Sequence, residues 1–272
     1  MNKELKDIGL EFVLPSDELK PFIQCYWFLH ANKPSRHKLI ADGGVGIVFN
    51  FGTAFLNTTS ISSGMNHQII FTGPKMEACN VQLDSDLDAI GVRFLPGGAY
   101  PFLKNKIQLN TNHALPLYEK HLPNIDKLYS SLQQLNQTKH KITLLDNYFI
   151  ELLRNLKNRP DLWSYKVVDI MKRYNGTQTT DELAKIFSLS KKQFERRLKK
   201  ETGFSPKQLS RILRIQKARS LIKTKEDRSL TDISYDCDYF DQSHFIHDFK
   251  FFTQETAKEY LNKKQLSHFY NS

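Results

Sequence analysis

The N-terminal part of the chain, up to about residue 115, has short apolar runs broken by glycine and proline. Residues 45–52 (VGIVFNFG) and 67–74 (HQIIFTGP) are rich in β-branched and aromatic side chains, which favour strands. Residues 80–98 contain two alternating runs, VQL and AIGVRF, and we expect the segment SDLD to join them as a hairpin. Short strands with this punctuation are typical of a barrel or sandwich.

In the segment that precedes Pro160, apolar residues recur about every 3.6 positions, which is the period of an α-helix. Residues 141–158 (KITLLDNYFIELLRNLKN) predict one amphipathic helix that ends before Pro160. Its apolar stripe either packs on its own domain or forms an interface between two chains, and the sequence leaves both interpretations open. The stripe consists of Leu144, Leu145, Tyr148, Leu152, Leu153 and Leu156.

The pattern from residue 161 onward is almost wholly helical. Two similar units, at about 179–202 and 230–252, each predict a short helix, a tight turn and a second helix. A long apolar helix at 204–223 joins them. We therefore expect an α+β protein of two domains. Residues 1–115 form a mostly-β small barrel, 116–160 a helical linker, and 161–272 an all-α domain with two helix-turn-helix units joined by a long helix.

In the first unit, Thr180 is placed to cap the first helix and Ser190 to cap the second. Phe194 and Leu198 face inward at helical spacing. In a helix-turn-helix unit the second helix lies in the major groove, where Arg and Lys donate to guanine and Glu accepts from cytosine. The outward face carries Lys191, Lys192, Glu195, Arg196 and Lys199.

The second unit repeats this arrangement. Asp241 is placed to cap its second helix, and Phe245, Phe249 and Phe252 form the inner stripe. Glutamine pairs with adenine through two hydrogen bonds, and histidine donates or accepts. The side chains left facing outward are Gln242, Ser243, His244 and His247.

The charge is concentrated where these units lie. The chain has a formal net charge of +10 and a pI of about 9.3. Residues 191–225 contain 13 basic and 2 acidic side chains, a net charge of +11. Positive charge concentrated in one segment indicates a surface that binds nucleic-acid phosphates. A helix face exposed only to solvent would show the same count of charges.

Other chemistry finds little support in the sequence. No GxSxG, GxxxxGK[ST] or GxGxxG motif occurs, and we expect the protein not to be an enzyme. His244 and His247 with nearby Cys237 lack a third suitable ligand, so we expect neither a metal nor another cofactor. No apolar run of ~18 residues and no secretory signal occur, which predicts a cytoplasmic protein without membrane contact.

Residues 161–263 resemble the DNA-binding domain of the AraC/XylS family. The resemblance rests on LAKIFSLSKKQFERRLKKETGFSPKQL, on the R-x-x-x-A-R-x-L-I pattern that begins at Arg214, and on LTDISYDCDYFDQSHFIHDFKFFT. It implies sequence-specific binding to double-stranded promoter DNA. It also implies base reading by Lys192, Glu195, Arg196, Gln242, Ser243, His244 and His247. We expect backbone contacts from Lys191, Lys199, Thr180 and Lys250.

This sequence departs from the family pattern at a few positions. Asp238 stands where the family usually has glycine in the second turn, and aspartate tolerates a left-handed turn better than most residues. His247 stands where arginine is common, which implies a weaker or a pH-sensitive contact there. Gln254 and Ala257 replace the usual glycine and proline after the second unit.

The N-terminal half resembles, more loosely, a small-barrel sensor domain of one AraC subgroup, through CYWFL (25–29) and GVRFLPGGAYPFL (91–103). The resemblance implies a transcription regulator that acts with RNA polymerase, and we expect it to activate transcription. Whether the N-terminal half binds a small-molecule effector or forms a homodimer is left open by the sequence. Arg93 either receives an anionic effector, or lies at an edge or faces outward, or pairs with Asp42 or Asp88. Two rival hypotheses are an enzyme or small-molecule binder with accessory helices, and a protein-interaction adaptor that has lost DNA binding.

Overall fold

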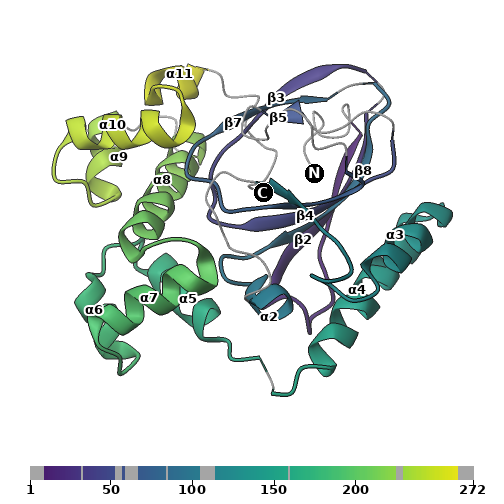
Figure 1. Cartoon of the computed structure of the whole chain (residues 1–272). Helices are drawn as coiled ribbons and strands as arrows, with labels where there is room; N and C mark the ends of the chain where they lie inside the picture. The colour runs from purple at the N-terminus through teal and green to yellow at the C-terminus, as the bar shows by residue number, and fades with distance from the viewer. Residues whose placement is uncertain are drawn as a thin grey trace.

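The computed structural model describes residues 9–31, 33–52, 57–58, 67–83, 85–104, 114–158, 160–224 and 229–262. A β-rich part with its own helices lies beside a helical C-terminal part (Figure 1). Within those ranges, no helix combines the length and the apolar character that a membrane span requires.

The β-rich part contains two antiparallel sheets. The larger sheet has the strand order β1-β2-β8-β4-β6-β9, and the smaller has the order β3-β7-β5. No pairing joins the two sheets among the described strands, so the expected small barrel is not closed. The strands are β1 Leu10–Val13, β2 Ile23–His30, β3 Ser35–Leu39, β4 Val45–Asn50, β5 Asn57–Thr58, β6 Ile69–Thr72, β7 Cys79–Leu83, β8 Asp88–Phe94 and β9 Ala114–Pro116.

The two runs that we expected to form a hairpin belong to different sheets. Strand β7 pairs with β3 and β5, whereas β8 pairs with β2 and β4. Leu87, just before β8, is fully buried in a core that residues of both sheets share, among them Trp27 and Val81. The hairpin prediction is wrong because alternation identifies a strand but not its partner.

The larger sheet is covered on both faces, and this explains the continuous apolar run of β4. All six residues of β4 are buried. Ile47 and Phe49 face one core and Val48 faces the other, which lies toward the smaller sheet. On the neighbouring strand, a Cβ at Gly91 would lie 1.8 Å from the Trp27 ring, so glycine lets the indole cross the strand.

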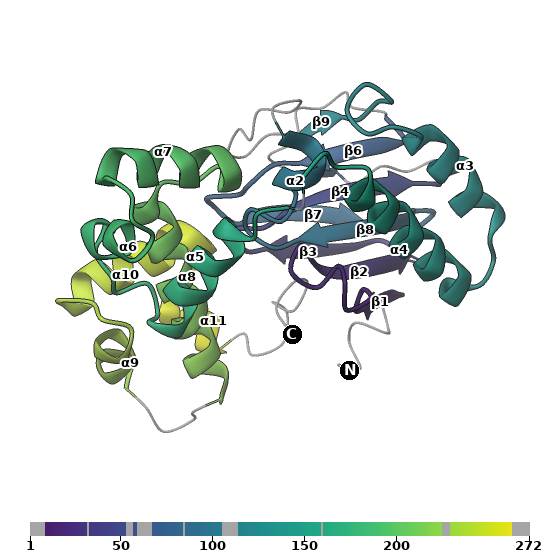
Figure 2. The same ribbon diagram turned by 90° about the horizontal axis from the view of Figure 1, so that it is seen from below.

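Helices α3 (Ile125–Gln134) and α4 (Thr138–Arg154) cover the outer face of the larger sheet, near the short helix α2 (Tyr100–Leu103) (Figure 2). Leu145 and Phe149 are fully buried there, and Phe149 meets Phe94 of the sheet edge-on at 5.7 Å. The Tyr26 hydroxyl donates to Asp146 at 2.8 Å. Residues of the predicted apolar stripe therefore pack on their own domain.

The helical part has one continuous core. Apolar residues of its longest helix, α8, recur at helical spacing and are buried along most of its length. The helices are α5 Trp163–Arg173, α6 Thr180–Ile186, α7 Lys191–Thr202, α8 Pro206–Thr224, α9 Leu230–Asp236, α10 Gln242–Thr253 and α11 Ala257–Asn262.

Two loops of the β-rich part enter this helical core. Ile40 and Ala41 come from the loop before β4, and Met76 and Ala78 come from the loop before β7. The Ala78 amide donates to the Phe252 carbonyl at 3.1 Å. The two parts of the chain therefore share apolar packing and backbone hydrogen bonding.

Asp42 fixes the first of these loops. Its carboxylate accepts hydrogen bonds from the Gly44 amide at 3.0 Å and from Arg93 Nε at 3.2 Å, and it forms an ion pair with Arg93. Its backbone carbonyl accepts from Gln216 Nε2 of α8 at 2.9 Å. Of the partners that the sequence offered to Arg93, the structure selects Asp42.

We predict that Asp42→Asn lowers the free energy of unfolding by about 3–5 kcal/mol, because Arg93 would keep a buried charge without its counter-ion. Urea denaturation followed by circular dichroism measures this. The control is Asp17→Asn, which breaks an exposed pair with Lys20 and should change stability little. Equal urea midpoints for the two variants would contradict the prediction.

Candidate nucleic-acid interface

A capping box begins the first helix of the first unit. The Thr179 hydroxyl accepts from the Glu182 amide at 3.2 Å, and the Glu182 carboxylate accepts from the Thr179 amide at 2.8 Å. This backbone hydrogen bond to the carboxylate lowers the pKa of Glu182. The prediction that Thr180 is the cap is wrong by one position, because Thr180 is already the first helical residue.

The turn between α6 and α7 is fixed by a left-handed residue and a second capping box. Ser188 has a φ of 53°, and Leu189 packs against the core. The Ser190 hydroxyl accepts from the Gln193 amide at 3.3 Å, and the Gln193 side chain accepts from the Ser190 amide at 2.9 Å. Ser190 is thus confirmed as the cap of α7.

Helix α7 separates a buried face from a basic one. Phe194 and Leu198 are fully buried, as predicted. Lys191 pairs with Asp181 at 2.8 Å, and this hydrogen bond raises the pKa of Lys191. Because both partners are more than half exposed, the pair is weak, and a phosphate could compete for the lysine. The exposed residues include all five side chains predicted to face outward: Lys191, Lys192, Glu195, Arg196 and Lys199.

Arg197 differs from its exposed neighbour Arg196. Its guanidinium lies 4.3 Å from the centre of the Trp163 ring, donates to Glu201 at 2.8 Å and pairs with Asp161. Burial opposes its charge, yet the hydrogen bonds to both carboxylates raise the pKa of Arg197. Arg197 therefore anchors α7, while Arg196 stays free to meet a ligand at the surface.

The second unit has the same plan with a longer turn. A capping box at Ser229 begins α9, and Asp238 has the left-handed φ of 58° that its place in the turn requires. Asp241 accepts from the His244 amide at 2.7 Å, which confirms it as the cap of α10. Between the left-handed residue and the cap, Leu189 of the first unit is matched by Tyr239 and an additional Phe240, which is 93% exposed.

Helix α10 buries Phe245, Phe249 and Phe252, as predicted. The His244 ring meets Tyr239 edge-on at 5.3 Å, and its Nε2 lies 3.8 Å from Asp248, so His244 is turned partly toward the domain. All five predicted side chains of this helix are nevertheless exposed: Gln242, Ser243, His244, His247 and Lys250.

Ile246 is exposed on the same helix, and the sequence prediction missed it. It lies three residues after Ser243 and four after Gln242, and residues at these spacings share one helix face. This spacing could have identified it. A search for polar base readers passed over it because its side chain cannot form a hydrogen bond.

Asp248 joins α10 to the rest of the helical part. It is 1% exposed and accepts from Arg211 of α8 at 2.7 and 3.2 Å and from the Tyr239 hydroxyl at 3.2 Å. The hydrogen bond that Arg211 donates to Asp248 raises the pKa of Arg211, and burial together with this carboxylate raises the pKa of Tyr239. The tyrosine therefore stays protonated and donates.

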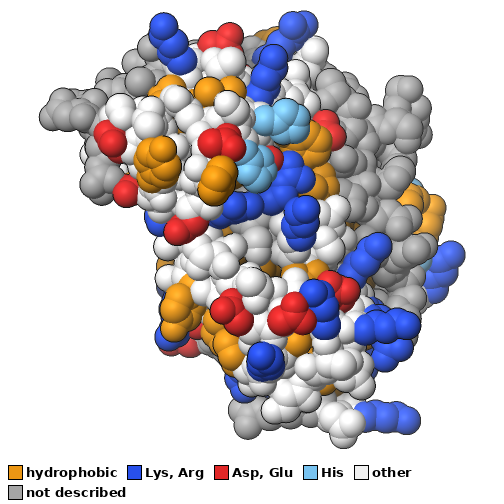
Figure 3. All heavy atoms as spheres, turned by 90° about the vertical axis from the view of Figure 1, so that its left-hand side faces the viewer, with side chains coloured by type: hydrophobic (Ala, Val, Ile, Leu, Met, Phe, Trp, Pro, Cys, Tyr) orange, Lys and Arg blue, Asp and Glu red, His pale blue; other side chains and the backbone are white. Residues whose placement is uncertain are grey.

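Both units lie at the end of the molecule away from the larger sheet (Figure 1). Figure 3 shows this end: lysine and arginine side chains gather over its lower part, and histidine side chains lie beside hydrophobic ones in its upper part. The lower part is the first unit and the upper part the second, in the orientation of Figure 1. The first unit therefore presents the more basic surface.

Comparison with known proteins finds two matching families. The model described as "Helix-turn-helix domain" matches residues 183–263, and the one described as "Domain of unknown function (DUF6597)" matches residues 11–116. The HTH-type transcriptional activator RhaS of Escherichia coli (strain SE11) is 34% identical over 94 residues, which are 35% of this chain and 34% of RhaS. The C-terminal part of the chain therefore contains a helix-turn-helix domain. The chain matches about a third of the length of these curated relatives.

Solved structures with similarity include a transcriptional regulator from Chromobacterium violaceum with an AraC-type DNA-binding domain. It is 24% identical, with 36% of this chain and 88% of that chain covered and a TM-score of 0.35. ToxT from Vibrio cholerae O395 is 13% identical, with 94% of this chain and 97% of that chain covered and a TM-score of 0.41.

Cys237 and the histidines of α10, which the sequence places near one another, differ in exposure. Cys237 is fully buried, whereas His247 is exposed. Across the described part of the chain, no group of three or more His, Cys, Asp or Glu side chains is arranged to hold a metal ion.

We predict that Asp248→Asn lowers the free energy of unfolding by about 3–5 kcal/mol, because Arg211 would lose the counter-ion of its partly buried charge. Thermal and urea unfolding measure the change. Lys250→Ala is the matched control, since this exposed residue of α10 should leave stability unchanged. A wild-type unfolding curve for Asp248→Asn would refute the structural role of the pair.

Proposed function

We propose that this protein is a sequence-specific DNA-binding transcription regulator. The observation that carries the proposal is the pair of capped helix-turn-helix units whose second helices, α7 and α10, have polar faces exposed on one end of the molecule. Helix α8 separates the units at a fixed spacing, which suits recognition of two successive major grooves about one helical turn (~34 Å) apart.

In this proposal, the charges of α7 and α8 supply affinity and the outward side chains supply sequence choice. Lys192 and Arg196 donate to guanine, and Glu195 accepts from cytosine N4. Lys191, Lys199, Thr180 and Lys250 contact phosphates. In α10, Gln242, Ser243, His244 and His247 read the second groove.

The name of a curated relative supports activation as the direction of regulation. RhaS is named a transcriptional activator, and 94 residues of this chain are 34% identical to it. We propose that this protein likewise activates transcription together with RNA polymerase. The β-rich part would bind a small effector or hold a second copy of the chain. Arg93 is a weak candidate for an anionic effector, since Asp42 already neutralises it.

We predict that Arg196→Ala weakens binding to a selected duplex by about 1–3 kcal/mol and relaxes the base preference at one position. Selection from a random duplex library, followed by fluorescence anisotropy, measures both. Arg197→Ala is the matched neighbour: loss of its contacts to Asp161 and Glu201 should lower stability and leave base preference unchanged. A change of base preference in Arg197→Ala alone would reverse the assignment.

We also predict a steep dependence of DNA affinity on salt, because each neutralised phosphate releases counter-ions. Lys199→Ala should reduce the slope of log K against log salt by about 1, equally for every sequence. Lys139→Ala, an exposed lysine of α4, serves as control and should leave the slope unchanged. A flat slope for the wild-type protein would favour the adaptor hypothesis over DNA binding.

A further inference from the structure

The two recognition helices can be compared position by position from their caps, Ser190 and Asp241. Phe194 corresponds to Phe245, and both are fully buried. Thr202 corresponds to Thr253, and each hydroxyl donates back to the carbonyl four residues earlier, at 2.7 and 2.6 Å. Because the buried positions coincide, the exposed positions of the two helices also correspond.

This correspondence shows a chemical difference at the centre of the exposed faces. Lys250 stands at the position of Lys199, so a cation is kept at the end of each face. His247 stands at the position of Arg196. Ile246, which is 41% exposed, stands at the position of Glu195. The second helix thus replaces the carboxylate of the first with a branched hydrocarbon side chain.

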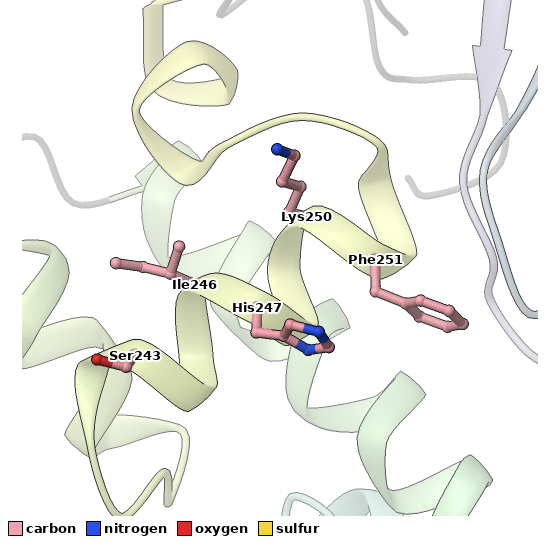
Figure 4. Close-up of a pocket in the computed structure, with 5 residues that line it drawn as sticks. All are labelled: Ser243, Ile246, His247, Lys250 and Phe251. Carbon is pink, nitrogen blue, oxygen red and sulfur yellow. The ribbon is translucent and has the colours of Figure 1, made fainter.

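The surroundings of Ile246 form a shallow hollow on α10. Its volume is about 510 Å³, and Ser243, Ile246, His247, Lys250 and Phe251 line it. Figure 4 shows these side chains leaving successive turns of the same helix, with Ile246 pointing to one side in this view and His247 and Phe251 to the other. An apolar surface is therefore bordered by a hydroxyl, an imidazole and an ammonium group.

The apolar group that the major groove offers is the C5 methyl of thymine, which isoleucine contacts without a hydrogen bond. The Lys250 ammonium beside the hollow suits the phosphates of the same groove. In contrast, Glu195 and Arg196 of α7 suit cytosine and guanine.

We propose that Ile246 of α10 packs against a thymine methyl group in the second half-site, so that the two half-sites differ in base composition. The first half-site contains the G·C pairs that α7 reads, and the second contains a thymine in contact with α10. This inference rests on the proposed function and adds a specificity residue to it.

The test begins with a duplex selected from a random library by the full-length protein. Hydroxyl-radical footprints of Lys199→Ala and Lys250→Ala assign its halves to α7 and α10. Each thymine of the second half-site is then replaced by deoxyuridine, which removes only the C5 methyl. At one position, wild-type affinity should fall roughly fourfold, the amount that burial of one methyl group contributes.

Ile246→Ala should bind the thymine duplex roughly fourfold more weakly than wild type does. The variant should bind the thymine and deoxyuridine duplexes with the same affinity, because it no longer contacts the methyl group. Arg196→Ala is the matched control and should keep the full deoxyuridine effect in the second half-site. Thermal unfolding checks that both variants are folded.

Three results would overturn the inference while leaving DNA binding intact. Deoxyuridine has no effect in the second half-site; Ile246→Ala keeps the deoxyuridine effect; or Ile246→Ala binds both duplexes as wild type does and loses only transcription with polymerase, which would assign the hollow to a protein partner. Failure of the full-length protein to select any two-part motif would instead refute the proposed function, and the inference with it.

Discussion

The arrangement of the β-rich part and the helical part depends on the hydrogen bonds and the ion pair of Asp42. The residue is buried, and its carboxylate accepts hydrogen bonds from the Gly44 amide and the Arg93 guanidinium. Its backbone carbonyl accepts a hydrogen bond from the Gln216 side chain of α8. A buried charge is tolerated only where its hydrogen bonds are made, so the loop has little freedom to adopt another shape. Gly43 beside it has a φ of 78°, a conformation that glycine adopts without strain.

The fixed shape of this loop has consequences at a distance. It carries Ile40 and Ala41 into the helical core, and the loop before β7 adds a backbone hydrogen bond from Ala78 to Phe252 at the end of α10. Lys38 of β3 pairs with Glu255 just after that helix. The β-rich part therefore holds the inner side and the end of the second unit, and the exposed faces of α7 and α10 stay available.

Within the helical part, some arginines form contacts that stabilise the fold, whereas another is exposed at the surface. Arg197 and Arg211 are paired with carboxylates, and Arg219 is buried and donates to Tyr260 at 3.1 Å. Arg196, in contrast, is exposed. The high positive charge of residues 191–225 thus combines side chains that stabilise the fold with side chains that can meet DNA.

Most of the helical part could be predicted from local pattern, because helix period, caps and turns depend on neighbouring residues. Ser190, Asp241 and the buried stripe of Phe245, Phe249 and Phe252 were all predicted from local spacing. The outward faces of α7 and α10 followed from the same spacing.

Strand pairing and the choice of ion-pair partners depend on contacts between residues that are distant in sequence, so local pattern could not predict them. Alternation located β7 and β8 but could not show that they pair in different sheets. Of the acids that could neutralise Arg93, only the fold selects Asp42, 51 residues away. The partial burial of Arg197 likewise depends on what packs beside its helix. Local pattern fixes the faces of an element, and the packing of distant elements decides which faces are covered.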